Sequence, residues 1–123
     1  MTKKTILVVE DEPSISDLLK YIFEREGYSV LVAADGEQAI KLARVKRPDI
    51  ILLDIILPKL DGYSVNRQLQ LEEKTANIPT IILTGNSEIQ NMSELDKNVL
   101  VYLEKPFDFV ILREKVAEVI KNG

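Results

Sequence analysis

The sequence predicts a single α/β domain in which a parallel sheet of five strands carries helices on both faces. Its 123 residues are close to the commonest length of one folded domain. Five short apolar runs, rich in β-branched residues, are separated by segments whose apolar residues recur at helical spacing. Strands that alternate with helices favour right-handed crossovers and a doubly wound parallel sheet. We therefore expect residues 1–123 to form one domain.

The predicted strands are short and show little alternation of polar and apolar residues. Such runs are typical of strands that are buried on both faces of a parallel sheet. In chain order they are Ile6–Val9, Val30–Ala34, Ile50–Leu53, Thr80–Leu83 and Val99–Leu103.

The first predicted helix begins at Pro13, where the missing N–H is tolerated, and ends at Gly27. Its apolar residues form one stripe: Ile15, Leu18, Leu19, Ile22 and Phe23. The second helix follows a plain turn at Asp35-Gly36 and ends at Pro48. Its apolar residues are Ala39, Ile40 and Ala43.

Three more helices are predicted, which makes five in all. The third begins near Asp61-Gly62. The fourth begins at Ser87, with Gln90 at the spacing of a capping box. The last follows Pro106 and runs to the end of the chain. The apolar residues of these helices are Val65 and Leu69, then Ile89, Met92 and Leu95, then Phe109, Leu112, Val116, Val119 and Ile120.

Composition limits the chemistry that the chain can perform. With 46% hydrophobic and 29% charged residues it can bury a core, and its net charge of −4 argues against direct nucleic-acid binding. The absence of cysteine and histidine excludes disulfides, thiolate metal sites, a cysteine nucleophile and a Ser-His-Asp triad. No apolar run approaches the ~7–15 residues of a signal peptide or the ~20 of a membrane span. We expect a soluble, cytoplasmic protein with no membrane partner.

Polar residues follow four of the five predicted strands. Because ligands of open α/β sheets bind beyond the carboxyl ends of the strands, these residues are the candidates for a site. They are Glu10 and Asp11, Asp54, Thr84 and Gly85, and Glu104 and Lys105.

The acidic residues predict a metal site. Asp54 lies in an apolar stretch, where a carboxylate needs charged or hydrogen-bonded partners. Glu10 and Asp11 are its expected neighbours, and three converging carboxylates suit a hard divalent ion such as Mg²⁺. Capping of the first helix is an alternative role for Glu10 and Asp11.

The remaining candidates favour chemistry on a phosphoryl group. Lys105 could clamp an anion or simply be a solvated surface residue. Thr84 could be an ordinary strand-end residue or a hydroxyl that bonds an incoming oxygen, and Gly85 lets backbone N–H groups approach a ligand. Without cysteine or histidine the plausible nucleophile is a carboxylate, and aspartate nucleophiles form aspartyl phosphates. Neither a Walker A loop nor a dinucleotide-binding glycine motif is present.

These motifs together resemble the receiver domain of two-component response regulators. Over nearly the whole chain, four segments occur in the expected order: Val8–Pro13, Asp54–Gly62, Thr84-Gly85 and Tyr102–Phe107. The resemblance implies a flavodoxin-like fold with strand order 2-1-3-4-5. It also implies that Asp54 accepts a phosphoryl group from a histidine kinase, a histidine phosphotransfer protein or acetyl phosphate.

The resemblance further implies the role of each site residue. Asp11, Asp54 and the carbonyl of Ile56 would bind Mg²⁺ (or Mn²⁺), and Glu10 would act through a metal-bound water. Lys105, Thr84 and the N–H of Gly85 would hold phosphoryl oxygens. Movement of Thr84 would let Tyr102 swing inward, and the Lys105-Pro106 bond would be cis. The face formed by the fourth helix, fifth strand and last helix would then signal to a downstream protein or a fused output domain.

Some residues depart from the commoner family pattern. Glu10 replaces the more frequent first aspartate, and Asp96–Tyr102 lacks the usual Gly-Ala-x-x-Tyr. Ile56 and Asn86 occupy positions that tune dephosphorylation in relatives, and neither can position a water by charge.

Two other functions are open alternatives. A small-molecule phosphohydrolase would use Asp54 as its nucleophile, but it would want a second acid where Ile56 stands. A pseudo-receiver would bind partners without phosphorylation, yet Asp11, Asp54 and Lys105 are all present.

Overall fold

The structure is a computed structural model that describes residues 3–84 and 98–122. The predicted fourth helix, Gly85 and Asn86 lie outside these residues. For Thr84 and Tyr102 only the backbone is described.

Five parallel strands form one sheet, in the order β2-β1-β3-β4-β5. The predicted fold class and strand order are therefore confirmed. The strand bounds are β1 Thr5–Val9, β2 Ser29–Ala33, β3 Ile50–Asp54, β4 Thr80–Thr84 and β5 Val99–Glu104.

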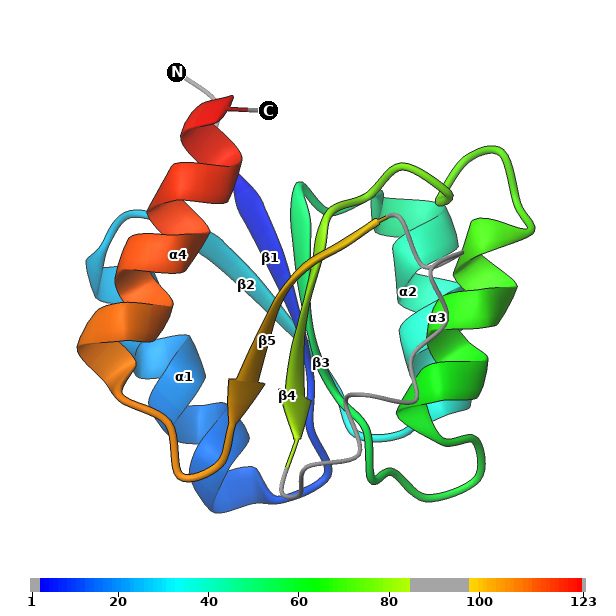
Figure 1. Cartoon of the computed structure of the whole chain (residues 1–123), viewed down its shortest axis with the longest axis horizontal. Helices are drawn as coiled ribbons and strands as arrows, with labels where there is room; N and C mark the ends of the chain where they lie inside the picture. Colours follow the sequence, from blue (N-terminus) through cyan, green and yellow to red (C-terminus); the bar gives the residue numbers. More distant parts are fainter. Residues whose placement is uncertain (1–2, 85–97, 123) are drawn as a thin grey trace.

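Four helices in the described part of the chain cover the two faces of the sheet. They are α1 Pro13–Arg25, α2 Gly36–Lys46, α3 Gly62–Gln70 and α4 Phe109–Asn122. Figure 1 shows α1 and α4 on one side of the sheet, with α2 and α3 on the other. The helix predicted after Pro106 is confirmed as α4.

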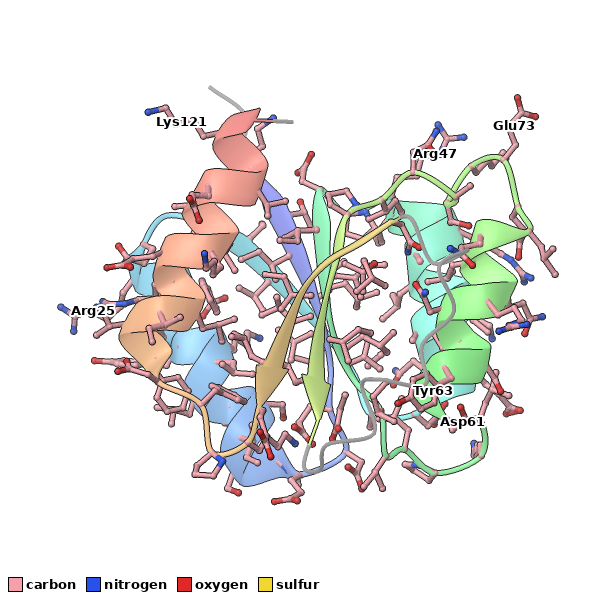
Figure 2. The ribbon with its side chains drawn as sticks, viewed as in Figure 1. Arg25, Arg47, Asp61, Tyr63, Glu73 and Lys121 are labelled. Carbon is pink, nitrogen blue, oxygen red and sulfur yellow. The ribbon has the colours of Figure 1, made fainter. Side chains whose placement is uncertain are left out.

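Each face of the sheet contributes to its own apolar core. Leu7 and Val9 of β1 pack toward α2 and α3, whereas Ile6 and Val8 pack toward α1 and α4. Figure 2 shows side chains filling both layers. Burial on two sides explains why the strand sequences do not alternate.

Side-chain caps fix the starts of two helices. Asp35 accepts a hydrogen bond from the Gln38 N–H at 2.9 Å, and Asp61 accepts one from the Ser64 N–H at 3.0 Å. The first of these was predicted only as a plain turn. Both aspartates therefore satisfy helix N–H groups that would otherwise lack intrahelical partners.

A buried polar network anchors the start of β5. Asn98 is only 9% exposed, and its amide Nδ2 donates to Asn66 Oδ1 at 2.6 Å and to Thr80 Oγ1 at 3.2 Å. Its Oδ1 accepts from Gln70 Nε2 at 2.7 Å. These bonds join the segment before β5 to α3 and β4, in the stretch where the sequence departs from the family pattern.

Candidate functional site

Strands β1, β3 and β5 bring acidic and basic residues to one edge of the sheet, where the strands have their carboxyl ends. Glu10 and Asp11 follow β1, Asp54 ends β3, and Lys105 follows β5. Since Val9 is in register with Leu53, Glu10 and Asp54 come to the same level of neighbouring strands. The predicted meeting of these residues is thus what the parallel sheet produces.

Two of the three carboxylates are buried. Glu10 is 1% exposed and Asp54 is 4% exposed, whereas Asp11 lies at the surface. One carboxylate oxygen from each residue lies within 4.8 Å of the other two. Burial of so much negative charge is unfavourable unless cations or hydrogen-bond donors meet it.

Lys105 supplies the cation. Its Nζ lies 2.9 Å from Glu10 Oε1 and 3.0 Å from Asp54 Oδ2, so one ammonium bridges both buried acids. The Lys105 side chain is 21% exposed, which distinguishes it from a solvated surface lysine. With Asp11 nearby, the cluster has three acids and one base and keeps a negative charge.

The pKa shifts reflect this crowding. Burial raises the pKa of Glu10, a hydrogen bond from Lys105 opposes that rise, and the charge of Asp54 adds to it. Burial by itself would lower the pKa of Lys105, but its hydrogen bonds to Glu10 and Asp54 outweigh burial and raise it. The cluster therefore favours the protonated, charged form of Lys105 and makes ionisation of Glu10 less favourable than in a free glutamate.

Backbone N–H groups also meet the two buried acids. The Glu12 N–H donates to Glu10 Oε2, and the Ile56 N–H donates to Asp54 Oδ1, each at 3.3 Å. The N-cap of α1 is Glu12, and its side chain makes no capping bond. The N-cap position of α1 is therefore occupied by neither Glu10 nor Asp11, although the Glu10 carboxylate accepts the N–H of the N-cap residue.

Gly62 lies against the backbone of Asp54, a contact that sequence reasoning missed. A Cβ atom on Gly62 would lie 2.6 Å from the Ile55 Cα and would also clash with the Asp54 carbonyl. The Asp-Gly pair that begins α3 was the available signal. Only glycine lets α3 approach the end of β3 so closely.

The other predicted site residues are described only in part. Thr84 is in register with Glu104, which brings the end of β4 beside the residue that precedes Lys105. The Lys105-Pro106 peptide bond is cis, as the resemblance implied. The side chains of Thr84 and Tyr102, and all of Gly85, lie outside the described residues, so their roles stay predictions.

The donor set fits a hard divalent cation. Its atoms are carboxylate oxygens, two of them from buried residues, and the single ammonium leaves excess negative charge in the cluster. Mg²⁺ prefers oxygen ligands and usually keeps several waters. Asp11 and Asp54 would hold the ion, with the Ile56 carbonyl and Glu10 as further ligands in the roles that the resemblance implies.

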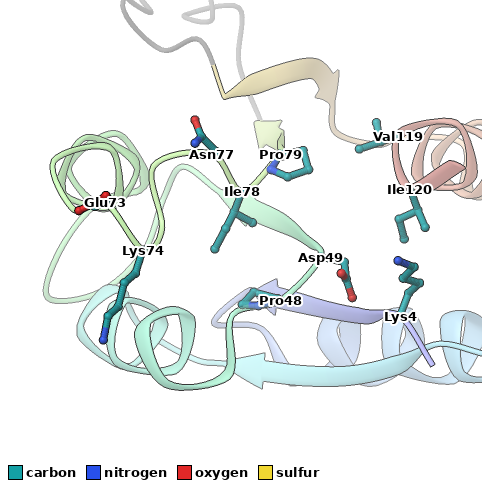
Figure 3. Close-up of a pocket in the computed structure, with 10 residues that line it drawn as sticks. All are labelled: Lys4, Pro48, Asp49, Glu73, Lys74, Asn77, Ile78, Pro79, Val119 and Ile120. Atoms are coloured by element: carbon teal, nitrogen blue, oxygen red, sulfur yellow. The ribbon is translucent and has the colours of Figure 1, made fainter. Parts of the chain in front are cut away.

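A pocket also lies at the opposite edge of the sheet, where β1, β3 and β4 begin (Figure 3). It contains none of the predicted site residues. Charges of both signs line it, from Lys4 and Lys74 and from Asp49 and Glu73. The Asp49 carboxylate accepts the Thr5 N–H at 2.7 Å, so this acid secures the start of β1.

Comparison with known proteins decides the family. The family model described as "Response regulator receiver domain" matches residues 6–117. This chain belongs to that family. No helix in the described ranges is long and apolar enough to cross a membrane.

Curated relatives of this receiver domain include transcriptional regulators. The chain is 40% identical over 121 residues to the alkaline phosphatase synthesis transcriptional regulatory protein PhoP of Bacillus subtilis. It is 39% identical over 118 residues to the DNA-binding dual master transcriptional regulator RpaA of Synechocystis. These matches cover 98% and 95% of the receiver domain but only 50% and 49% of the relatives. The chain thus spans about half the length of each.

Solved structures with the same fold are receiver domains. One is the receiver domain of the sensor histidine kinase PA1611 from Pseudomonas aeruginosa, with a magnesium ion in its active-site cleft. It is 35% identical with a TM-score of 0.86, and the match covers 98% of this chain and 99% of that one. A CheY-like receiver domain from Methanospirillum hungatei is 28% identical with a TM-score of 0.89, over 98% and 96% of the two chains.

Membership places this receiver domain in two-component signal transduction. Receiver domains of response regulators partner with histidine kinases, and they are signalling domains rather than conventional enzymes.

Proposed function

We propose that this receiver domain, residues 1–123, is a phosphorylation-controlled switch in which Asp54 accepts a phosphoryl group. The donor would be a histidine kinase or a histidine phosphotransfer protein. One observation carries the proposal: the Lys105 ammonium contacts Asp54 at 3.0 Å beside a second buried acid, Glu10. Phosphoryl transfer depends mainly on positioning and charge stabilisation, and this cluster is suited to both.

Each residue has a distinct part in the proposed reaction. A carboxylate oxygen of Asp54 forms the new bond to phosphorus while the bond from phosphorus to the donor breaks. The ammonium of Lys105 turns from the carboxylate to an oxygen of the transferred group. The Thr84 hydroxyl and the Gly85 N–H hold further oxygens, a role that rests on the family resemblance.

The proposed metal is Mg²⁺, with Mn²⁺ as a substitute. Asp11, Asp54 and the Ile56 carbonyl would hold it, and Glu10 would do so through a water. The magnesium reported for the PA1611 receiver domain supports this assignment. When bound, the ion would offset negative charge on the carboxylates and on the phosphoryl oxygens.

The proposed output is a change in protein contacts. Phosphorylation would move Thr84 and Tyr102 and reshape the face that the resemblance assigns to the predicted fourth helix, β5 and α4. That face would act on a downstream protein or a fused output domain in the cytoplasm. Because the chain has a net charge of −4, we do not propose that it binds DNA directly.

Intact mass spectrometry after incubation with acetyl phosphate and Mg²⁺ tests this function. We expect the wild type to gain one phosphoryl group, and Asp54→Asn or removal of Mg²⁺ to abolish the gain. Asp17→Asn, an equal change on the exposed face of α1, is the matched control and should be phosphorylated like the wild type. An unmodified wild type, or labelling that survives Asp54→Asn, would contradict the proposal. Sustained release of inorganic phosphate would instead favour a phosphohydrolase.

A further inference from the structure

The loop between β3 and α3 (residues 55–61) is tied to the start of α2 by ion pairs. The Lys59 Nζ lies 3.6 Å from Asp35 Oδ2 and 3.9 Å from Glu37 Oε1. Asp35 is itself fixed, because it caps α2 through the Gln38 N–H. This N–H, with a smaller contribution from the Lys59 ammonium, lowers the pKa of Asp35. The lysine therefore contacts an acid that is held in place and remains charged.

The backbone at Lys59 adopts a conformation that a residue with a side chain rarely takes. Its φ is +68°, and the Leu60 N–H donates to the Pro58 carbonyl at 2.7 Å. A three-residue turn with this central φ is rare and strained for residues other than glycine. Such a turn persists when surrounding contacts hold it, and the ion pairs to α2 are contacts of this kind.

The next residue, Leu60, packs directly on the first residue of α2. A Cβ atom on Gly36 would lie only 2.8 Å from the Leu60 Cβ. Leu60 and Leu57 also pack against the core on this face of the sheet. The tip of the loop is therefore secured by both charge and packing.

The base of the same loop lies at the candidate metal site. The Gly62 N–H donates to the Ile55 carbonyl at 2.8 Å and closes the loop. The Ile56 N–H contacts the Asp54 carboxylate. Ile56, which is proposed to offer its carbonyl to the metal, thus lies between a base fixed at Asp54 and a tip fixed at α2.

We propose that Lys59 is a positioning residue for the metal site: its ion pairs with Asp35 and Glu37 hold the loop so that Asp54 and Ile56 keep the arrangement that binds Mg²⁺. This inference rests on the metal site of the proposed function. Lys59 acts through the loop and contacts neither the ion nor the phosphoryl group.

The direction in which the Mg²⁺ affinity changes when Lys59 is removed distinguishes a positioning role from a purely electrostatic one. If Lys59 acted only as a nearby positive charge, its removal would lessen repulsion of Mg²⁺ and tighten binding. If it holds the loop, its removal weakens binding. When the stabilisation that an exposed ion pair provides is expressed as a change in the Mg²⁺ Kd, it equals about two- to five-fold.

The test is calorimetric titration of the full chain with MgCl₂. We expect Lys59→Ala to raise the Mg²⁺ Kd about two- to five-fold and Lys59→Arg, which keeps the charge, to stay near wild type. Lys41→Ala removes an equal charge from the exposed surface of α2 and should leave the Kd unchanged or slightly lower. Hydrogen exchange of the Leu60 amide should also become faster in Lys59→Ala, because its bond to Pro58 is no longer held.

An unchanged or lower Kd in Lys59→Ala would overturn the positioning role, as would a higher Kd without faster Leu60 exchange. A wild type that binds no Mg²⁺ would overturn it too. The acetyl phosphate experiment reports separately on Asp54. If Asp54 is phosphorylated while Lys59→Ala leaves the Kd unchanged, only the positioning role fails. If the Kd rises as expected but Asp54 takes no phosphoryl group, only the proposed function fails.

Discussion

At the scale of single residues, the site is a compromise between burial and charge. Glu10 and Asp54 are almost fully buried, and Lys105 is the cation that contacts both. The pKa of Glu10 is nevertheless raised, so folding makes its ionised form less favourable than it is in the unfolded chain. The acids are held together at a cost in stability, as functional sites often are.

This compromise predicts a pH-dependent effect of Glu10→Gln. A carboxyl whose pKa is raised by folding binds its proton more tightly in the folded state, so its ionisation lowers stability as pH rises above about 4. We therefore expect Glu10→Gln to be more stable relative to wild type at pH 7 than at pH 4, so that the variant's free energy of unfolding minus that of wild type increases with pH. Urea unfolding in EDTA measures this difference. Glu12→Gln makes the same change at an exposed position and is the matched control. A relative stability of Glu10→Gln that falls toward pH 7 would refute the expectation.

At the scale of elements, helix starts position the loops of the site. Asp61 caps α3 with two bonds, accepting the Ser64 N–H at 3.0 Å and the Ser64 hydroxyl at 2.9 Å. These bonds outweigh partial burial and lower the pKa of Asp61. The next residue, Gly62, packs on the backbone of Asp54, so the residue that caps α3 and the residue that contacts the site are adjacent in the chain.

Loss of this cap should destabilise the domain. We expect Asp61→Ala to lower the free energy of unfolding at pH 7 by about 1 kcal/mol. Since folding lowers the pKa of Asp61, its contribution is present above about pH 4 and is lost as pH falls through the lower folded value. The difference from wild type should therefore shrink in acid, as measured by urea unfolding across this range. Asp61→Asn keeps a capping acceptor and should lose much less stability; an equal loss would show that the cap is not the cause.

Strands and helices were predictable from the sequence where a pattern within a single segment specifies them. The strands match their apolar runs to within one residue at each end, because burial on two faces leaves a continuous run. At Asp35 the sequence predicts a plain turn and not a cap, since Asp-Gly occurs both in turns and at the starts of helices. The Asn98 network was not predicted, because it exists only where α3, β4 and the segment before β5 meet. Likewise, the sequence predicted that Lys105 lies near the carboxyl ends of the strands, but not that its ammonium contacts both Glu10 and Asp54.

At the scale of the whole molecule, the site gathers residues that are distant in sequence. Glu10 and Lys105 are 95 residues apart, and Asp54 and Lys105 are 51 apart. A ligand that binds this cluster binds the folded state and not the unfolded chain, so it should stabilise the entire domain.

Magnesium should therefore raise the stability of the whole chain. At a free Mg²⁺ concentration of 100 times its Kd, we expect a gain of about 2.7 kcal/mol in the free energy of unfolding. Asp11→Ala should remove most of this gain because it deletes an exposed ligand while Glu10 and Asp54 keep their bonds to Lys105. Thermal unfolding with and without MgCl₂ checks this outcome. Asp17→Ala should retain the full gain, and a retained gain in Asp11→Ala would argue against its role as a ligand.

The order of the strands along the chain has a consequence for synthesis on the ribosome. β1 pairs with both β2 and β3, so the first 54 residues contain three neighbouring strands and all three acids of the cluster. Lys105 follows β5, which is the last strand to emerge and the outermost strand on one side of the sheet. A nascent chain that paired its early strands would bring the carboxylates together before their ammonium existed. Charge repulsion at the carboxyl ends of β1 and β3 would then persist until Lys105 arrived with the final strand, which links completion of the site to completion of the fold.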